Sequence, residues 1–252
     1  MNTEGAIGIF DSGIGGFTVL KEIIKVLPNE NYIYYSDSKN NPYGDKSDKQ
    51  INALCENIVN LLIEQKCKII VIACNTASAK SVQYLRKKYT HIPFIAIEPA
   101  YKMVYDYAYD ESTLVMATKW TIESEKFNLL YHMYNNHKTI LFPCVGLADL
   151  IEEGNSSKIK IYLKQYLEPY KGKIRNVVLG CTHYPLIQHE IEETLGQVHF
   201  FNGAPYLATH LKNVLQEKNL VNHQQKKGTI QFIDSSNDKQ KKNRFFEILK
   251  EI

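Results

Sequence analysis

The feature that most constrains the fold is an order of strands and helices that occurs twice along the chain. Short runs of branched apolar residues, typical of buried parallel strands, alternate with helical segments that have one apolar face. The predicted strands of the first part start at Ile7, Ile33, Ile69 and Phe94, and those of the second part start at Thr113, Ile140, Asn176 and His199. Corresponding starts are 105 to 107 residues apart. This agreement predicts two structurally equivalent lobes, although their residue identity is low.

The predicted fold class is α/β, with two pseudo-symmetric, doubly wound lobes built on mainly parallel sheets. A chain of 252 residues is long enough for two such lobes, each with its own core. We expect the first lobe to comprise residues 1–98 and 208–252, and the second lobe to comprise residues 99–207. The segment 208–252 belongs to the first lobe because its predicted strand, Thr229–Ile233, needs a sheet edge to join.

Two of the predicted strands end in a cysteine that is followed by small polar residues. The strand Ile69–Ala73 leads into Cys74, and the strand Val177–Gly180 leads into Cys181. Ligands of open α/β sheets bind beyond the carboxyl ends of the strands. We therefore expect both thiols to face a shared active-site cleft between the lobes.

Two thiols on opposite sides of a small ligand suit proton transfer at a stereocentre. One thiolate would remove the proton, and the other thiol would return a proton to the opposite face. A free thiol with a pKa near 8.5 is a poor base at neutral pH, so neighbouring groups must activate it. Asp11 would serve Cys74 in this way, and His183 with a carboxylate would serve Cys181. Helix N-termini and nearby polar side chains would hold an α-carboxylate: Ser12, Asn75, Thr76 and Thr182.

Other interpretations of these residues are less favoured but stay open. A metal site needs three or four ligands, and the Cys181–His183 pair supplies two. A cysteine hydrolase would leave Cys74 without a role, and both thiols would be inert if they were core residues. A nucleotide loop is disfavoured because Thr18 stands where a third glycine is required and because Asp11 would repel phosphate. Cys55 and Cys67 have no polar neighbours and are interpreted as core thiols.

The composition is that of an ordinary soluble protein. A net charge of +3 is too small to indicate a nucleic-acid partner, and no apolar run reaches the roughly 18 residues of a membrane span. The N-terminal residues lack the pattern of a signal peptide, and the odd number of cysteines, five, is typical of reduced thiols. We therefore expect a cytoplasmic protein with no nucleic-acid or membrane partner.

Several motifs along the chain are specific enough to indicate a family. They are Ile9–Gly16 in the first loop, Asn41–Gly44 with Lys46 and Ser47, Ala73–Ala77, Ile97–Pro99, and Gly180–Leu186. With them, the sequence resembles the cofactor-independent aspartate/glutamate racemase family, and within it the glutamate racemases. The resemblance implies two α/β lobes with the active site between them, in agreement with the repeat.

The resemblance also implies roles for individual residues. Cys74 and Cys181 would be the acid/base thiols, and the catalytic set would also include Asp11, Glu152 and His183. The implied substrate-binding residues are Asp11, Ser12, Pro42, Tyr43, Gly44, Asn75, Thr76, Thr118, Thr121, Thr182 and His183. Some positions depart from the family pattern: Trp120 replaces a glycine, Cys144–Asp149 replaces a proline-rich approach to Glu152, and Asn202-Gly203 replaces an acidic residue and a serine.

The implied activity is the interconversion of L- and D-glutamate without pyridoxal phosphate, metal or other cofactor. The product D-glutamate would supply peptidoglycan synthesis, and the enzyme would be a homodimer. Two alternatives remain: a sister racemase for aspartate or another small acidic amino acid, and a non-catalytic amino-acid-binding protein of the same fold.

Overall fold

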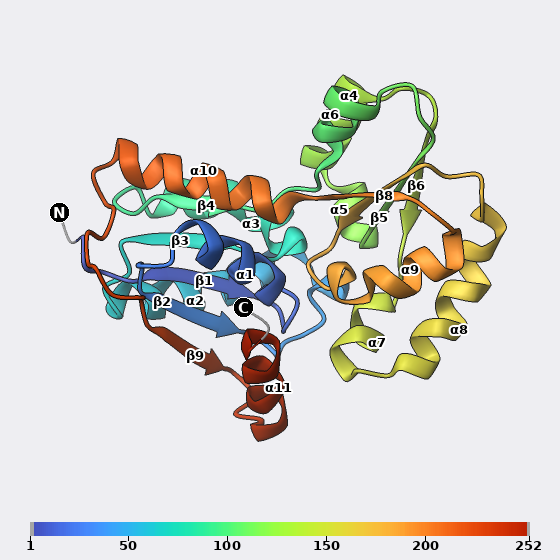
Figure 1. Ribbon diagram of the computed structural model, residues 1–252. Coiled ribbons are helices and arrows are strands. Elements are labelled where there is room, and N and C mark those ends of the chain that lie inside the picture. The colour runs from blue at the N-terminus through green and yellow to red at the C-terminus, as the bar shows by residue number, and fades with distance from the viewer. Residues whose placement is uncertain (1–2, 251–252) are drawn as a thin grey trace. The chain divides into compact units, whose positions relative to one another are not determined.

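The computed structural model describes residues 3–250, which divide into two compact units (Figure 1). Unit 1 extends to Ile97 and resumes at Ala204, and unit 2 is Glu98–Gly203. These borders lie one and four residues before the expected ones. Unit 1 resumes earlier than expected because α10 (Gly203–Glu217) begins directly after the last strand of unit 2. Residues 1, 2, 251 and 252, which were assigned to the first lobe, lie outside the described part.

Unit 1 contains a five-stranded parallel sheet in the order β4-β3-β1-β2-β9. Its strands are β1 (Ile7–Asp11), β2 (Tyr32–Ser36), β3 (Ile69–Ile72), β4 (Phe94–Ala96) and β9 (Ile230–Asp234). Its other helices are α1 (Phe17–Val26), α2 (Asp48–Glu64), α3 (Asn75–Lys88) and α11 (Lys239–Lys250), with a short 3₁₀ turn at Tyr43–Asp45. The predicted strand near residue 230 does join this sheet, beside β2 (Figure 1).

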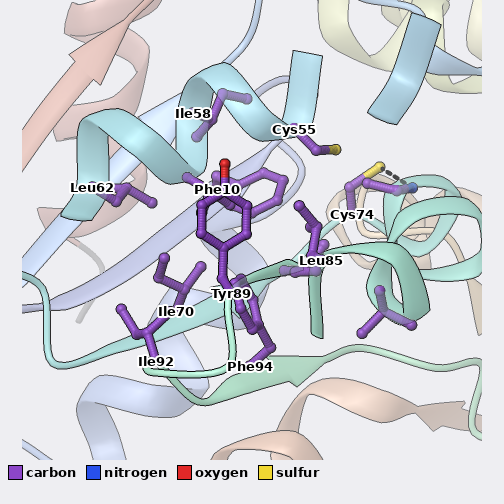
Figure 2. Packing of buried hydrophobic residues seen from close by; sticks show 14 of the residues in the cluster. Phe10, Cys55, Ile58, Leu62, Ile70, Cys74, Leu85, Tyr89, Ile92 and Phe94 are labelled. Atoms are coloured by element: carbon purple, nitrogen blue, oxygen red, sulfur yellow. Dashed lines mark hydrogen bonds between the residues drawn. The ribbon is translucent and has the colours of Figure 1, made fainter. Parts of the chain in front are cut away.

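The helices α2 and α3 cover one face of this sheet. Figure 2 shows Phe10 and Ile70 of the strands packed with Ile58 of α2 and Leu85 of α3. On the other face, Phe17 of α1 and Phe245 of α11 lie against each other, with ring centroids 4.3 Å apart. The strands are therefore buried on both faces, which explains their continuous apolar character.

Unit 2 contains a four-stranded parallel sheet in the order β6-β5-β7-β8. Its strands are β5 (Thr113–Ala117), β6 (Thr139–Pro143), β7 (Asn176–Gly180) and β8 (His199–Asn202). Its helices are α4 (Tyr101–Ala108), α5 (Lys119–Glu123), α6 (Glu125–Tyr134), α7 (Leu147–Glu153), α8 (Ser156–Leu167) and α9 (Gln188–Leu195), with 3₁₀ turns at Glu168–Tyr170 and Tyr184–Ile187. Residues of α7, α8 and α9 form one core, and residues of α4 and α6 form a second core.

The two sheets have the same topology, which confirms the predicted fold class. The order β4-β3-β1-β2 of unit 1 corresponds to β8-β7-β5-β6 of unit 2. The pairing is also equivalent, because Ile7 lies opposite Ile69 and Thr113 lies opposite Asn176. In each sheet, the second and third strands of the unit lie on opposite sides of the first strand. The topological switch point is therefore at the carboxyl ends of the first and third strands, and sheets of this kind bind ligands there.

Three helices begin or end for local reasons that the apolar pattern does not report. The helix α3 begins at Asn75 because the sulfur of Cys74 caps it. The segments after β5 and β6 contain α5 and α7. Thr118 caps α5, whereas glycines with positive φ, Gly146 at 77° and Gly154 at 70°, bound α7. Caps depend on side-chain geometry that hydrophobic periodicity does not report.

The two thiols that the sequence analysis interpreted as core residues are buried. Cys55 and Cys67 are buried in the core of unit 1, and burial raises the pKa of each thiol to about 12. These thiols therefore stay protonated and act as packing groups, as predicted. Within residues 3–250, every helix falls short of the length and apolar character needed to cross a membrane.

Candidate active site

Cys74 lies at the switch point of unit 1, separated from the end of β3 by Ala73. It is the N-cap of α3, with extended backbone angles, and its sulfur accepts a hydrogen bond from the amide of Ala77 at 3.5 Å (Figure 2). The helix dipole places partial positive charge at this end. Negative charge on the sulfur is therefore stabilised at this position.

A line of hydrogen bonds connects Cys74 to the tip of the neighbouring strand. The thiol donates to Ser12 Oγ at 3.7 Å, and Ser12 Oγ donates to Asp11 Oδ1 at 3.1 Å. The same carboxylate oxygen accepts from the amide of Gly13 at 3.0 Å. Asp11 is fully buried at the end of β1. The arrangement gives the thiol proton a route to a carboxylate through one hydroxyl.

The loop after β2 lies beside Asp11. The amide of Asp37 donates to the carbonyl oxygen of Asp11 at 2.9 Å, and Tyr43 donates its hydroxyl hydrogen to Asp37 Oδ2 at 2.7 Å. Burial raises the pKa of Tyr43 well above its ordinary value, so the phenol remains a donor. Pro42, which follows a cis peptide bond, and Gly44 flank this tyrosine. Asp37 therefore connects the predicted Pro42–Gly44 segment to the strand tip that carries Asp11.

Asn75 and Thr76 form the first turn of α3 and are almost completely buried. The side-chain oxygen of Asn75 is buried and accepts no hydrogen bond within the described part of the chain. An ammonium or hydroxyl group of a ligand would satisfy it.

In unit 2, Cys181 lies at the equivalent switch point, after β7. Its sulfur is 3.7 Å from His183 Nδ1, and His183 Nε2 is 2.7 Å from Glu152 Oε2. Glu152 lies on α7, far away in the sequence, and all three side chains are buried. The structure thus brings the three predicted catalytic residues of this unit into one thiol–imidazole–carboxylate line.

The environment of His183 keeps a proton on its imidazole. Burial by itself would lower the pKa of His183, but hydrogen bonds to Cys181 and Glu152 outweigh it and hold the pKa well above the ordinary value. A histidine with this environment can give a proton to the neighbouring sulfur or take one from it.

The three predicted threonines of unit 2 lie at the same edge of the sheet. Thr118 follows β5, whose last residue, Ala117, is opposite Gly180 of β7. Its hydroxyl oxygen accepts from the amide of Thr121 at 3.2 Å and lies 2.9 Å from the Thr121 hydroxyl. Thr182 is buried beside Cys181. All three threonines therefore belong to the end of the sheet that carries Cys181.

In unit 1, sequence reasoning did not single out Tyr34 of β2, whose hydroxyl donates a hydrogen bond to the loop after Asp11. The available signal was a tyrosine in a buried strand next to a glycine-rich loop. Trp120, the departure from the family pattern on α5, is 36% exposed.

Comparison with known proteins identifies the family of this chain. The family model of Asp/Glu/Hydantoin racemase matches residues 18–211. A curated glutamate racemase from Clostridium perfringens (strain SM101 / Type A) is 41% identical over 251 residues, covering 98% of this chain and 95% of the relative.

Solved structures give the same result. A glutamate racemase from Francisella tularensis in complex with D-glutamate superimposes with a TM-score of 0.83 at 31% identity, covering 98% of this chain and 94% of that chain. A glutamate racemase isoform from Bacillus anthracis gives a TM-score of 0.86 at 28% identity, covering 99% and 95%. The family inferred from the motifs is confirmed: this chain belongs to the Asp/Glu/hydantoin racemases, a family of isomerases.

Proposed function

We propose that the protein is a glutamate racemase that interconverts L- and D-glutamate by proton transfer at Cα between two thiols. The main observation in support of this proposal is that a cysteine lies at the equivalent switch point of each unit. In each unit a cysteine follows the third strand and has its own proton-transfer partner. Cys74 is linked to Asp11 through Ser12, and Cys181 is linked to His183 and Glu152. The 41% identical relative is a glutamate racemase, and the Francisella tularensis structure contains D-glutamate.

The proposed reaction uses the two thiols on opposite faces of one Cα atom. In one direction a thiolate takes the Cα proton and becomes a thiol, while the opposite thiol gives its proton to the other face and becomes a thiolate. The products are the other enantiomer and an enzyme whose two sulfurs have exchanged protonation states. The Ser12–Asp11 and His183–Glu152 lines would then restore the starting state by proton exchange with water.

Stabilising the carbanion-like transition state is the larger demand, because a Cα proton is far less acidic than a thiol. We propose that the first turn of α3, with Asn75 and Thr76, and the hydroxyls of Thr118, Thr121 and Thr182 bind the polar groups of the substrate. Fixed donors around the α-carboxylate lower the energy of the charge that develops beside it.

The proposal can be tested by solvent isotope incorporation. Each glutamate enantiomer is incubated in D₂O with no added cofactor, and deuterium at Cα and optical rotation are followed together. We expect deuterium incorporation and loss of optical activity from both enantiomers. Cys74→Ala and Cys181→Ala should each reduce racemisation by about 10²- to 10⁴-fold, the usual contribution of a general acid or base.

Cys55→Ala provides the matched control, since it removes a buried thiol that stays protonated. It should leave racemisation near the wild-type rate. Near-normal turnover in either Cys74→Ala or Cys181→Ala would contradict the two-thiol mechanism. Faster turnover of aspartate would favour the sister racemase, and glutamate binding without Cα exchange would favour the binding protein.

We further propose a homodimer in the cytoplasm that supplies D-glutamate for peptidoglycan. Sedimentation velocity would measure the oligomeric state. Growth of a D-glutamate auxotroph that expresses this chain would test the physiological role, and failure of the active protein to restore growth would contradict it.

A further inference from the structure

Tyr34 is a fully buried residue of β2 that no step of the proposed reaction uses. It lies opposite Ile9 on β1, two residues before Asp11. Its hydroxyl donates a hydrogen bond of 2.9 Å to the carbonyl oxygen of Gly13. The hydroxyl is therefore directed at the loop that connects β1 to α1, and this loop contains Ser12.

Gly13 is held from two sides. Its amide donates to Asp11 Oδ1 at 3.0 Å, and its carbonyl accepts from Tyr34. Ser12, the preceding residue, donates to the same carboxylate oxygen and accepts from the thiol of Cys74. A rotation of the loop at Gly13 would therefore disturb the line of hydrogen bonds between Cys74 and Asp11.

Gly16 gives independent evidence that the Tyr34 hydroxyl occupies a fitted position. A Cβ atom at Gly16 would lie 2.5 Å from the hydroxyl oxygen of Tyr34 and 2.7 Å from Cβ of Asp11. Real Cβ atoms do not approach so closely. The hydroxyl thus fills space that is left by the missing side chain, between the loop and the carboxylate.

The ring of Tyr34 is fixed by an aromatic cluster from three other elements. Its centroid lies 4.2 Å from that of Phe17 on α1, 6.1 Å from Phe232 on β9 and 6.2 Å from Phe245 on α11. Phe232 and Phe245 stack on each other at 4.2 Å. A ring packed on several sides holds its hydroxyl in one place.

We propose that Tyr34 is a positioning residue for the Cys74 half of the reaction. By fixing the Gly13 carbonyl, its hydroxyl keeps Ser12 and Asp11 aligned with the thiol. This inference rests on the proposed function for its kinetic consequence, but its structural consequence, a change in the reactivity of Cys74, is independent of that function.

The test compares Tyr34→Phe with Tyr32→Phe. Tyr32 lies two residues away on the same strand, is also buried, and also donates its hydroxyl hydrogen to a backbone carbonyl, that of Leu27. Leu27 is the C-cap of α1, and Tyr32 pairs with Ile7 at the start of β1, so this hydrogen bond lies at the other end of the strands from Asp11. Each variant loses one buried hydroxyl, and we expect similar shifts in the midpoint of urea unfolding.

The kinetic difference should be large. We expect Tyr34→Phe to lower kcat about 10-fold or more in both directions, with KM within about twofold, because small misplacements of reacting groups slow chemistry strongly. Tyr32→Phe should keep near-wild-type kcat. With Cα-deuterated substrate, Tyr34→Phe should raise the primary deuterium isotope effect on kcat in one direction of racemisation. Ser12→Ala should raise it in the same direction. Glu152→Gln, which perturbs the other thiol, should raise it in the opposite direction.

A second measurement uses no turnover. Alkylation of Cys74 and Cys181 by iodoacetamide is followed by mass spectrometry between pH 6 and 9. Tyr34→Phe should change the Cys74 rate several-fold and leave Cys181 unchanged, and Tyr32→Phe should change neither. If both tyrosine variants give the same Cys74 rate, the positioning role is overturned even when the wild type racemises glutamate. If the wild type lacks racemisation but Cys74 alkylation still responds to Tyr34→Phe, the proposed function fails and the positioning role stands.

Discussion

The two thiols have chemically different partners. Cys74 reaches a carboxylate through the hydroxyl of Ser12, whereas Cys181 contacts an imidazole directly, with Glu152 behind it. The pKa of His183 lies well above its value near 6.5 in the unfolded chain, so the contribution of this imidazole to stability changes as the pH rises above that value. We therefore expect the pH dependence of the protein to be dominated by the His183 line.

Glu152→Gln tests this expectation through stability. The pKa of His183 in the folded protein lies above its unfolded value, so protonation of His183 favours folding. This contribution is complete below the unfolded pKa, near 6.5, and is lost as the pH rises through the raised, folded pKa. Glu152→Gln should therefore lower the free energy of unfolding by about 1 to 3 kcal/mol at pH 6, the range for hydrogen bonds to charged groups, and by less at higher pH.

Urea unfolding at several pH values measures the effect. Glu193→Gln is the control, because it removes the carboxylate partner of His189 in an exposed pair. It should cause no comparable pH-dependent loss. A Glu152→Gln effect that is the same at all pH values would contradict the assignment.

At the scale of the elements, the close approach of β5 and β7 places Cys181. Gly180 immediately precedes the thiol, and a Cβ atom there would lie 2.8 Å from Cβ of Ala117 and 2.9 Å from the carbonyl oxygen of Met116. The strand ends can adopt their observed spacing because residue 180 has no side chain. The equivalent thiol of unit 1 is instead fixed by its place as the cap of α3.

Gly180→Ala should separate these strand ends. We expect a loss of about 1 to 3 kcal/mol in the free energy of unfolding, as for other overpacked sites, together with reduced racemisation. Adding Ala117→Gly removes one of the two close contacts and should recover part of the stability. Denaturant unfolding and turnover of the single and double variants measure both effects, and a fully stable, fully active Gly180→Ala protein would refute this account.

At the scale of the whole molecule, a buried ion pair joins distant parts of unit 1. Lys68 Nζ contacts Glu30 Oε2 at 2.6 Å and donates to the carbonyl oxygen of Thr3, while Glu30 Oε1 accepts from the amide of Asn222 at 2.8 Å. Both charged side chains are almost fully buried. The pair therefore ties the segments before β1, β2 and β3 to the C-terminal part that returns from unit 2.

Lys68→Met should destabilise the protein by about 3 to 5 kcal/mol, because it leaves the buried Glu30 carboxylate without its countercharge. The double variant Lys68→Met/Glu30→Met should recover most of this loss. Lys25→Met, which breaks the exposed pair with Glu22, should change stability by less than about 1 kcal/mol. Equal effects of Lys68→Met and Lys25→Met in urea unfolding would contradict the prediction.

Much of the fold could be predicted from the sequence because it is encoded by local patterns. Apolar runs such as Ile69–Ile72 define buried strands, the spacing of such runs defines the duplication, and the residues that follow a parallel strand must lie at its ligand-binding edge. These rules placed Cys74 and Cys181 at strand ends without any knowledge of the rest of the structure.

The sequence by itself thus determined the two equivalent sheets, the return of a C-terminal strand to the first sheet and the thiols at the strand ends. Only the tertiary structure decided that Glu152 meets His183, that Ser12 links Cys74 to Asp11, and that Tyr34 supports the loop between them. The physical reason is the range of the interactions. Periodicity acts between near neighbours in the chain, whereas these hydrogen bonds join groups up to 62 residues apart, whose distances are set by helix and sheet packing.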